Sequence, residues 1–308
     1  MKGPQNTRVM LNMHLAEVDC PVCGHNEKSV LYQDTLGARP PVFGYKWTPE
    51  VRLSYQIVTC AKCGHCFCSP RPDDIYKYYT DVADESYLLN SELRLKTANH
   101  IIQDIVKLVP RGRLIDIGCS TGDFLSVASK FYEAEGIELS DWAFQLACEK
   151  GLKVKKHEIQ HLVKNTEKYD VATMWGVIEH LENPKQDLIN TNRILNKGGI
   201  VCLWTGDISS IWARIFRQKW WYILGQHIQY FSRKSLAKLM SDCGFECVSD
   251  SIYPYVISMG YLGTSLSRYP VIGSVANWIL KQSILRDRCI TLKLSSEIFG
   301  IYRKVKNV

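Results

Sequence analysis

Residues 113–123 read Arg113-Leu-Ile-Asp116-Ile-Gly118-Cys-Ser-Thr-Gly122-Asp. The apolar run predicts a short strand at 113–117, and the glycines that follow allow backbone N–H groups to approach a ligand closely. The spacing is not that of the G-x-G-x-x-G dinucleotide loop. Asp116 stands two residues before the first glycine, where its charge would repel a pyrophosphate and favour a cationic ligand. The stretch therefore predicts a nucleoside-type site without phosphates.

A second carboxylate strengthens this prediction. Glu138 lies twenty residues beyond Gly118, at the end of an apolar run at 134–139. A carboxylate at this position suits hydrogen bonds to ribose hydroxyls. S-adenosylmethionine is a nucleoside with a positive centre and no phosphate, so it fits both carboxylates.

The surrounding sequence alternates strand-like and helix-like segments. Apolar runs predict strands, and apolar residues at helical spacing predict the helices between them. The expected order is strand 113–117, helix 123–132, strand 134–139, helix 141–150, strand 152–156, strand 169–174, helix 186–195 and strand 200–204, with a last strand-like run at 297–305. Such alternation predicts an α/β fold with a mainly parallel sheet and helices on both faces.

Composition sets wider limits. The chain has 308 residues, 46% of them hydrophobic and 22% charged, which excludes a disordered or fibrous protein. The net charge of +7 comes without a long basic block, so it supports contact with phosphate or a membrane surface only weakly. Residues 1–15 lack the apolar core of a secretion signal, and prolines and glycines interrupt the apolar segment 251–280. We therefore expect a cytoplasmic protein without a membrane-spanning helix.

Two Cys-x-x-Cys pairs stand near the start of the chain, Cys20/Cys23 and Cys60/Cys63. Four thiolates suit a tetrahedral structural zinc ion, although 36 residues separate the pairs. A redox pair and free thiols are the alternatives. His65, Cys66 and Cys68 follow directly and are either further ligands or ordinary buried residues.

The loop, the segment Gly136-Ile-Glu138-Leu139-Ser140, the segment 174–181 and Lys197-Gly-Gly199 occur in an order that resembles class I S-adenosylmethionine-dependent methyltransferases. The resemblance implies a Rossmann-like sheet and a set of cofactor contacts. These residues would contact the backbone-facing side, the ribose, the adenine and the methionine end of the cofactor. They are Asp116, Gly118, Cys119, Gly122, Glu138, Leu139, Glu158 and Trp175. For Glu158, a plain surface position is the alternative.

The N-terminal region resembles one subgroup of these methyltransferases. The second cysteine pair, Ser69-Pro-Arg-Pro72 and Tyr78-Tyr79 resemble zinc-knuckle methyltransferases, which include nucleotide-sugar C-methyltransferases and enzymes of polysaccharide pathways. This resemblance implies a small-molecule or saccharide acceptor, including nucleotide-linked or lipid-linked sugars. Acceptor contacts are expected from Tyr78, Tyr79, Gln226 and Tyr230.

An acceptor that loses a proton needs a base near neutral pH, and histidine is the first candidate. His227 lies in a polar stretch after an aromatic segment, and His180 follows the predicted strand 169–174. Glu179 either orients one of these rings or serves packing. The base is therefore expected to be His227 or His180.

We expect a zinc-binding lobe at 1–85 and a methyltransferase domain at 86–308, with an aromatic insertion at about 206–231 and a helical insertion at about 254–287. Ile208, Ile211, Trp212, Ile215 and Phe216 share one helix face, which predicts a lid packed on the sheet or an interfacial helix at a membrane. Two other functions stay open: an RNA-base methyltransferase, and a zinc-ribbon interaction protein with an inactive methyltransferase fold. No obligate protein partner is expected.

Overall fold

A seven-stranded sheet forms the centre of the computed structural model, which describes residues 15–37, 42–44, 50–164, 168–266 and 286–308. The strands run parallel except β15, which is antiparallel to both of its neighbours. Their order is β12 (Phe245–Ser251), β15 (Glu297–Lys304), β10 (Leu195–Gly206), β9 (Tyr169–Trp175), β6 (Arg113–Ile117), β7 (Glu133–Ile137) and β8 (Val154–Lys155). This arrangement confirms the predicted α/β class.

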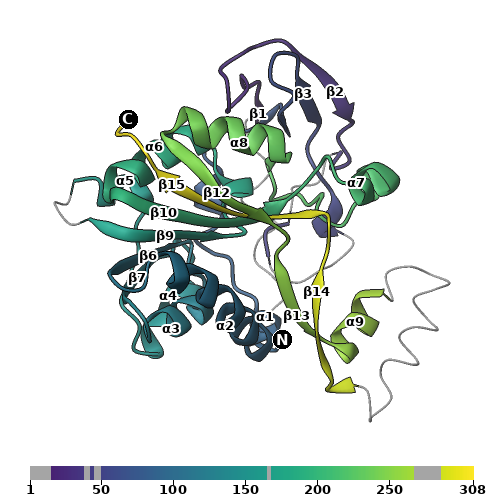
Figure 1. Cartoon of the computed structure of the whole chain (residues 1–308). Helices are drawn as coiled ribbons and strands as arrows, with labels where there is room; N and C mark the ends of the chain where they lie inside the picture. Colours follow the sequence, from purple (N-terminus) through teal and green to yellow (C-terminus); the bar gives the residue numbers. More distant parts are fainter. Residues whose placement is uncertain (1–14, 38–41, 45–49, 165–167, 267–285) are drawn as a thin grey trace.

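Helices cover both faces of the sheet (Figure 1). On one face lie α2 (Ser91–Leu108), α3 (Asp123–Ala128) and α4 (Asp141–Glu149), and on the other lie α5 (Ile159–Leu162), α6 (Pro184–Ile194) and α8 (Arg233–Asp242). Their starts follow from capping residues: the Ser140 hydroxyl accepts from the Ala143 N–H at 3.1 Å, and Asn183 caps α6 just before Pro184.

Two predicted boundaries are wrong. Helix α3 ends at Ala128, not near residue 132. Strand β10 begins at Leu195, directly after α6, so Gly198 and Gly199 lie within this strand and do not separate it from the helix. The register with β9 shifts between Leu195 and Ile200, and Gly198 has φ +80°, which shows that the glycines form an irregularity in the strand.

The N-terminal region is joined to the rest by a shared sheet. Its elements are β1 (Leu15–Ala16), β2 (Lys28–Tyr32), η3 (Glu50–Arg52), β3 (Ile57–Cys60), β4 (Cys66–Cys68), β5 (Arg71–Pro72), η4 (Ile75–Tyr78) and α1 (Glu85–Leu88). A four-stranded sheet runs β11-β4-β3-β2, and β11 (Gln229–Tyr230) comes from the later part of the chain. Gln229 pairs with Phe67, and Tyr230 pairs with Cys66.

The aromatic insertion differs from the predicted lid. It contains α7 (Ile211–Phe216) and η6 (Arg217–Lys219). Ile211 and Ile215 are 62% and 61% exposed, whereas Ala213 between them is buried. Ile208 and Phe216 of the predicted face pack against a buried core, so the expectation of a packed face is wrong for Ile211, Trp212 and Ile215.

The insertion predicted to be helical begins with a strand instead. Strand β13 (Pro254–Ser258) pairs antiparallel with β14 (Cys289–Lys293), and α9 (Met259–Leu266) follows β13. The ribbon lies against α2, where the Val256 N–H donates to the Thr97 hydroxyl at 3.0 Å. Residues 267–285 of the predicted insertion lie outside the described residues. Among the helices that the structure describes, none is long and apolar enough to cross a membrane.

Candidate active site

A cavity opens where strands β6, β7 and β9 end. Its wall includes Gly118 after β6, Glu138 after β7 and Trp175 at the end of β9. Ligands of open α/β sheets bind outside the carboxyl ends of the strands, so this is the expected place for a cofactor.

Gly118 allows the chain to turn tightly here. It has φ +68°, and a Cβ atom at this position would lie 2.7 Å from Cγ2 of Val177. Only glycine fits this backbone without displacing its neighbour. At this position the loop therefore presents main chain to the cavity.

Glu138 fastens the loop to the end of β7. Its Oε2 accepts from the Ser120 N–H at 2.7 Å, and its Oε1 accepts from the Leu139 and Ser140 N–H groups at 2.8 Å each. The carboxylate is 9% exposed and lines the cavity. Burial raises the pKa of Glu138, and the three backbone donors oppose this shift. Of the four acceptor sites of the carboxylate, these donors occupy three.

Asp116 lies one layer deeper and is not part of the cavity wall. Its Oδ1 accepts from the Thr173 hydroxyl at 2.6 Å, while its buried Oδ2 has no hydrogen-bond partner among the described residues. Burial raises the pKa of Asp116 to about 7. A buried carboxylate oxygen without a partner is a place where a ligand donor or a bridging water can bind.

Trp175 lines the same cavity. Its ring packs against Phe124, with 4.8 Å between the centroids, and its buried Nε1–H has no acceptor in the described part of the chain. Leu139 and Glu158 also line the cavity. Cys119 and Gly122 do not: Cys119 is buried towards Gly136, and Gly122 precedes α3.

The other end of the cavity carries His180, from η5 (Ile178–His180). Nδ1 of this ring is 2.9 Å from the Gln226 carbonyl oxygen and 2.6 Å from the Tyr79 hydroxyl. Tyr79 and Gln226 line the same cavity, and the Gln226 side chain accepts from the Gly44 N–H at 3.0 Å. The structure thus brings three predicted acceptor-side residues together.

Behind His180 lie His227 and Glu179. The two imidazole centroids are 4.7 Å apart, and Nδ1 of His227 is 2.7 Å from the Tyr222 carbonyl oxygen. Burial lowers the pKa of His180 to about 4, and burial beside His180 lowers the pKa of His227 well below its ordinary value. Burial also raises the pKa of Glu179 to about 7, although the Tyr222 and Thr205 hydroxyls donate to it. Both rings are therefore neutral at neutral pH.

Two predicted acceptor contacts lie elsewhere. Tyr230 is fully buried in β11 within an aromatic core, and Tyr78 stacks on Phe43 with 5.5 Å between the centroids. Neither belongs to the cavity wall, so the structure does not place them beside His180 at the acceptor end. Ser120 and Tyr87 do line the cavity and were not predicted. Ser120 stands between the two loop glycines, which was the one available signal.

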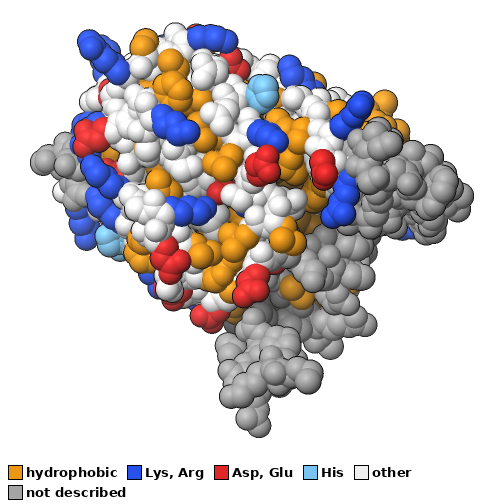
Figure 2. Space-filling model, turned by 90° about the horizontal axis from the view of Figure 1, so that it is seen from below, with side chains coloured by type: hydrophobic (Ala, Val, Ile, Leu, Met, Phe, Trp, Pro, Cys, Tyr) orange, Lys and Arg blue, Asp and Glu red, His pale blue; other side chains and the backbone are white. Residues whose placement is uncertain are grey.

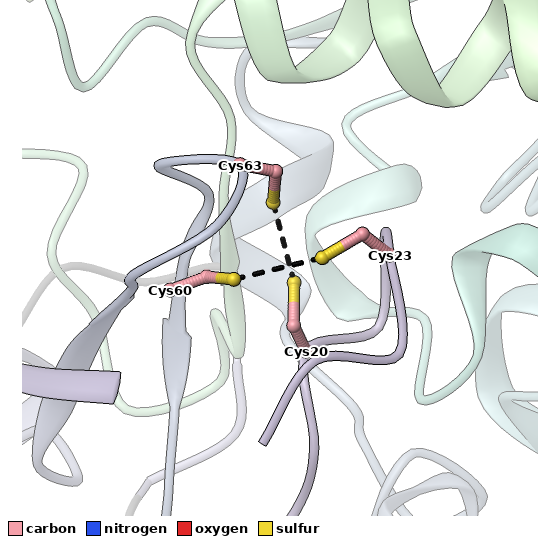
Figure 3. A group of neighbouring side chains, drawn as sticks. All are labelled: Cys20, Cys23, Cys60 and Cys63. Atoms are coloured by element: carbon pink, nitrogen blue, oxygen red, sulfur yellow. Dashed lines mark hydrogen bonds between the residues drawn. The ribbon is translucent and has the colours of Figure 1, made fainter. Parts of the chain in front are cut away.

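The four predicted metal-ligating cysteines converge (Figure 3). The Sγ atoms of Cys20 and Cys63 are 3.5 Å apart, and those of Cys23 and Cys60 are 3.6 Å apart. All four Sγ atoms lie within 4.8 Å of one another, and none is in a disulfide. A tetrahedral ion with metal–sulfur bonds of about 2.3 Å needs sulfurs about 3.8 Å apart, so the group fits zinc.

The alternative ligands lie outside this group. His65 is buried and its Nε2 is 3.0 Å from Oε1 of Gln229 in β11. Cys66 and Cys68 belong to β4, where Cys68 Sγ approaches the His227 carbonyl oxygen at 3.5 Å. Through these contacts, the N-terminal region is connected to the segment that contains His227 and Gln229.

Comparison with known proteins assigns the fold and the loop to a family. A family model described as a methyltransferase domain matches residues 90–250, more than half of the chain. The chain belongs to this methyltransferase family. Together with the cavity at the strand ends, this membership makes the chain an S-adenosylmethionine-dependent methyltransferase.

Relatives extend the comparison. An uncharacterized protein of Methanocaldococcus jannaschii is 26% identical over 149 residues, which are 47% of this chain and 70% of that protein. An S-adenosylmethionine-dependent methyltransferase of Archaeoglobus fulgidus has a TM-score of 0.50 at 18% identity, covering 72% of this chain and all of that one. A chain from a Haloferax volcanii complex of the Trm112 methyltransferase activator with a methyltransferase has a TM-score of 0.53 at 13% identity, covering 77% and 100%. These similarities show the fold of the methyltransferase.

Proposed function

We propose that this methyltransferase transfers the methyl group of S-adenosylmethionine to a small-molecule or saccharide acceptor that binds beside His180. One observation carries the proposal: Gly118 and Glu138 at one end, and His180 at the other, line a single cavity. A donor and an acceptor held at the two ends would meet within it.

The chain's own groups suit the cofactor. S-adenosylmethionine, when bound, supplies a methyl group on a positively charged sulfur. Glu138 would accept a hydrogen bond from a ribose hydroxyl at its remaining acceptor site. Asp116, with its unpartnered Oδ2, would lie near the methionine portion and act on it through its neighbours or water. Trp175 would flank the ligand and could donate its unpartnered Nε1–H.

Acceptor activation falls to the group of Glu179, His180 and His227. A ring with a pKa of about 4 is a weaker proton acceptor than an ordinary histidine. We therefore assign activation to the group as a whole, with His180 nearest to the acceptor.

The charges around the cavity favour a small acceptor over RNA. The described residues of its wall include Glu138, Glu158 and Asp187 but no Lys or Arg. On the face in Figure 2, Lys and Arg side chains are dispersed among acidic and apolar ones. Nucleic-acid sites gather basic side chains, so a neutral hydroxyl compound such as a saccharide fits better. The phosphates of a nucleotide-linked or lipid-linked sugar would then lie outside this wall.

The four cysteines are proposed to hold a structural zinc ion. The ion would have four thiolate ligands and no open position, so it would take no part in catalysis. Its role would be to tie the loops of the N-terminal lobe together against the core that Val58 and Phe67 share with α8.

Calorimetric titration with S-adenosylhomocysteine tests the cofactor site. We expect wild type to bind and Glu138→Gln to bind about ten- to a hundredfold more weakly, because one charged acceptor of ligand hydroxyls is lost. Glu135→Gln is the matched control: Glu135 lies in β7, the strand that Glu138 follows, but pairs with Arg113 and Lys155. No binding to wild type would contradict the proposal and favour an inactive interaction protein.

A screen with radiolabelled methyl donor then tests the acceptor. Methylation of saccharides or small hydroxyl compounds is expected. Methylation confined to RNA, with strong salt-sensitive RNA binding, would overturn the acceptor class and leave the cofactor assignment intact.

A further inference from the structure

Glu179, His180 and His227 have a second property besides their place at the acceptor end. Each offers one ligand atom, and these atoms lie within 4.8 Å of one another. His180 also lines the cavity, so the group has access to it. The four cysteines form a separate metal-ligating group within the described residues.

The backbone orients both imidazole rings in the same way. His180 Nδ1 faces the Gln226 carbonyl oxygen, and His227 Nδ1 faces the Tyr222 carbonyl oxygen. The Tyr79 hydroxyl, which lies 2.6 Å from His180 Nδ1, donates to the Gln226 carbonyl oxygen at 3.1 Å and therefore accepts from the ring. Because a carbonyl oxygen can only accept, we assign the hydrogen of each ring to Nδ1, which leaves the lone pair on Nε2. Neither Nε2 has a hydrogen-bond partner among the residues described. Metal-binding histidines are held in this manner, with one ring N–H donated to a carbonyl group.

Glu179 is a buried acid without a basic partner. It is 1% exposed, its Oε2 accepts from the Thr205 hydroxyl at 3.1 Å, and its Oε1 accepts from the Tyr222 hydroxyl. No Lys or Arg side chain pairs with it in the described part of the chain. Burying a carboxylate without a positive charge is unfavourable, and a cation beside it would offset that cost. The two hydroxyls fix the carboxylate, as outer contacts do at metal sites.

We propose that Glu179, His180 and His227 bind one divalent first-row transition-metal ion at the acceptor end of the cavity. Two imidazole nitrogens and one carboxylate leave open positions on such an ion. The donor set suits Mn²⁺, Fe²⁺, Co²⁺ or Zn²⁺ rather than Ca²⁺, because two of the three ligands are nitrogen.

The role of the ion rests on the proposed function, whereas its binding does not. An acceptor hydroxyl on an open position would lose its proton to water in the cavity more readily. The oxygen would then form the new carbon–oxygen bond as the methyl–sulfur bond breaks, and that electron pair would stay on sulfur. The products are a methyl ether and S-adenosylhomocysteine.

Mn²⁺ binding tests the site. The full chain is first loaded with one equivalent of Zn²⁺, which the four thiolates would take, and is then titrated with Mn²⁺ followed by electron paramagnetic resonance. We expect one Mn²⁺ per chain. His180→Gln and His227→Gln should each weaken binding by about tenfold or more, whereas His157→Gln, on the wall of the same cavity, should not.

Spin-echo spectra of wild type give a readout that needs no variant, and two coupled imidazole nitrogens are expected. Failure of wild type to bind Mn²⁺, or unchanged binding in both His180→Gln and His227→Gln, would overturn the site. Titration of the same samples with S-adenosylhomocysteine distinguishes failure of the metal site from failure of the proposed function. Cofactor binding without Mn²⁺ binding overturns the metal site alone, whereas loss of cofactor binding in wild type overturns the proposed function.

Discussion

At Gly118 the main chain occupies space that any side chain would need. We expect Gly118→Ala to lower the free energy of unfolding by about 1–3 kcal/mol, because the new Cβ meets Val177 in a left-handed conformation. It should also weaken S-adenosylhomocysteine binding. Chemical denaturation and calorimetry measure the two effects.

Gly151→Ala is the control for backbone strain alone. Gly151 has φ +75°, but a Cβ atom added there would meet no atom of the described residues within 4 Å beyond its chain neighbours. It should lose less stability than Gly118→Ala and keep its ligand affinity. Equal effects of the two substitutions would mean that the contact with Val177 is unimportant.

Asp116 predicts a pH dependence. Its pKa is raised to about 7 in the folded protein, above the value near 4 of an unfolded chain. The folded state therefore holds the proton more tightly, and the stability that this contributes is complete below pH 4 and lost as the pH rises to about 7. The wild type should lose stability relative to Asp116→Asn across this range, as measured by urea unfolding at several pH values. Parallel curves for the two proteins would show that Asp116 does not titrate there.

At the scale of elements, the sequence pattern predicted a strand or helix correctly where one short run of residues determines its position. Strand β6 spans the predicted residues because Leu114, Ile115 and Ile117 are buried within the sheet. The ribbon of β13 and β14 was missed because its partners are far apart in sequence and Pro254 suggested an interruption.

The site shows the same division. Asp116, Gly118 and Glu138 follow from the strand–loop pattern, since their places depend on nearby residues. Tyr87 lines the cavity and Tyr230 is buried away from it, and the sequence could not distinguish them because only tertiary packing decides which aromatic ring reaches the cavity.

Helix α7 leads to a prediction of its own. Ile211, Trp212 and Ile215 are exposed on it, with Arg214 in its last turn. Such a surface favours contact with anionic lipid. We expect the protein to co-sediment with anionic vesicles at low salt, and the double variant Ile211→Glu/Ile215→Glu to stay in solution. Val248→Glu, a change at an exposed valine of β12, should still sediment. Wild type that remains in solution at low salt would exclude this contact.

At the scale of the whole molecule, we expect the cysteine group to stabilise more than its own loops. Cys60 ends β3, which pairs with β4, and β4 pairs with β11 next to His227. We expect Cys23→Ser to lower Tm by roughly 5 °C or more. It should also raise the KM for the acceptor while changing the affinity for S-adenosylhomocysteine little, because the cofactor end is built by β6 and β7.

Thermal unfolding and steady-state kinetics of the zinc-loaded proteins measure these effects. Cys247→Ser is the control, since Cys247 is an exposed cysteine outside the group. A Tm equal to that of wild type in Cys23→Ser would argue against a structural metal ion.

The pairing of β11 with β4 also has a consequence for synthesis on the ribosome. Phe67 leaves the exit tunnel long before its partner Gln229 has been translated. The first lobe to emerge must therefore wait with an open sheet edge until most of the chain has followed. Exposed edges are sites of unwanted pairing between nascent chains. Metal binding by the four cysteines soon after their synthesis would keep the N-terminal lobe folded until β11 has been translated.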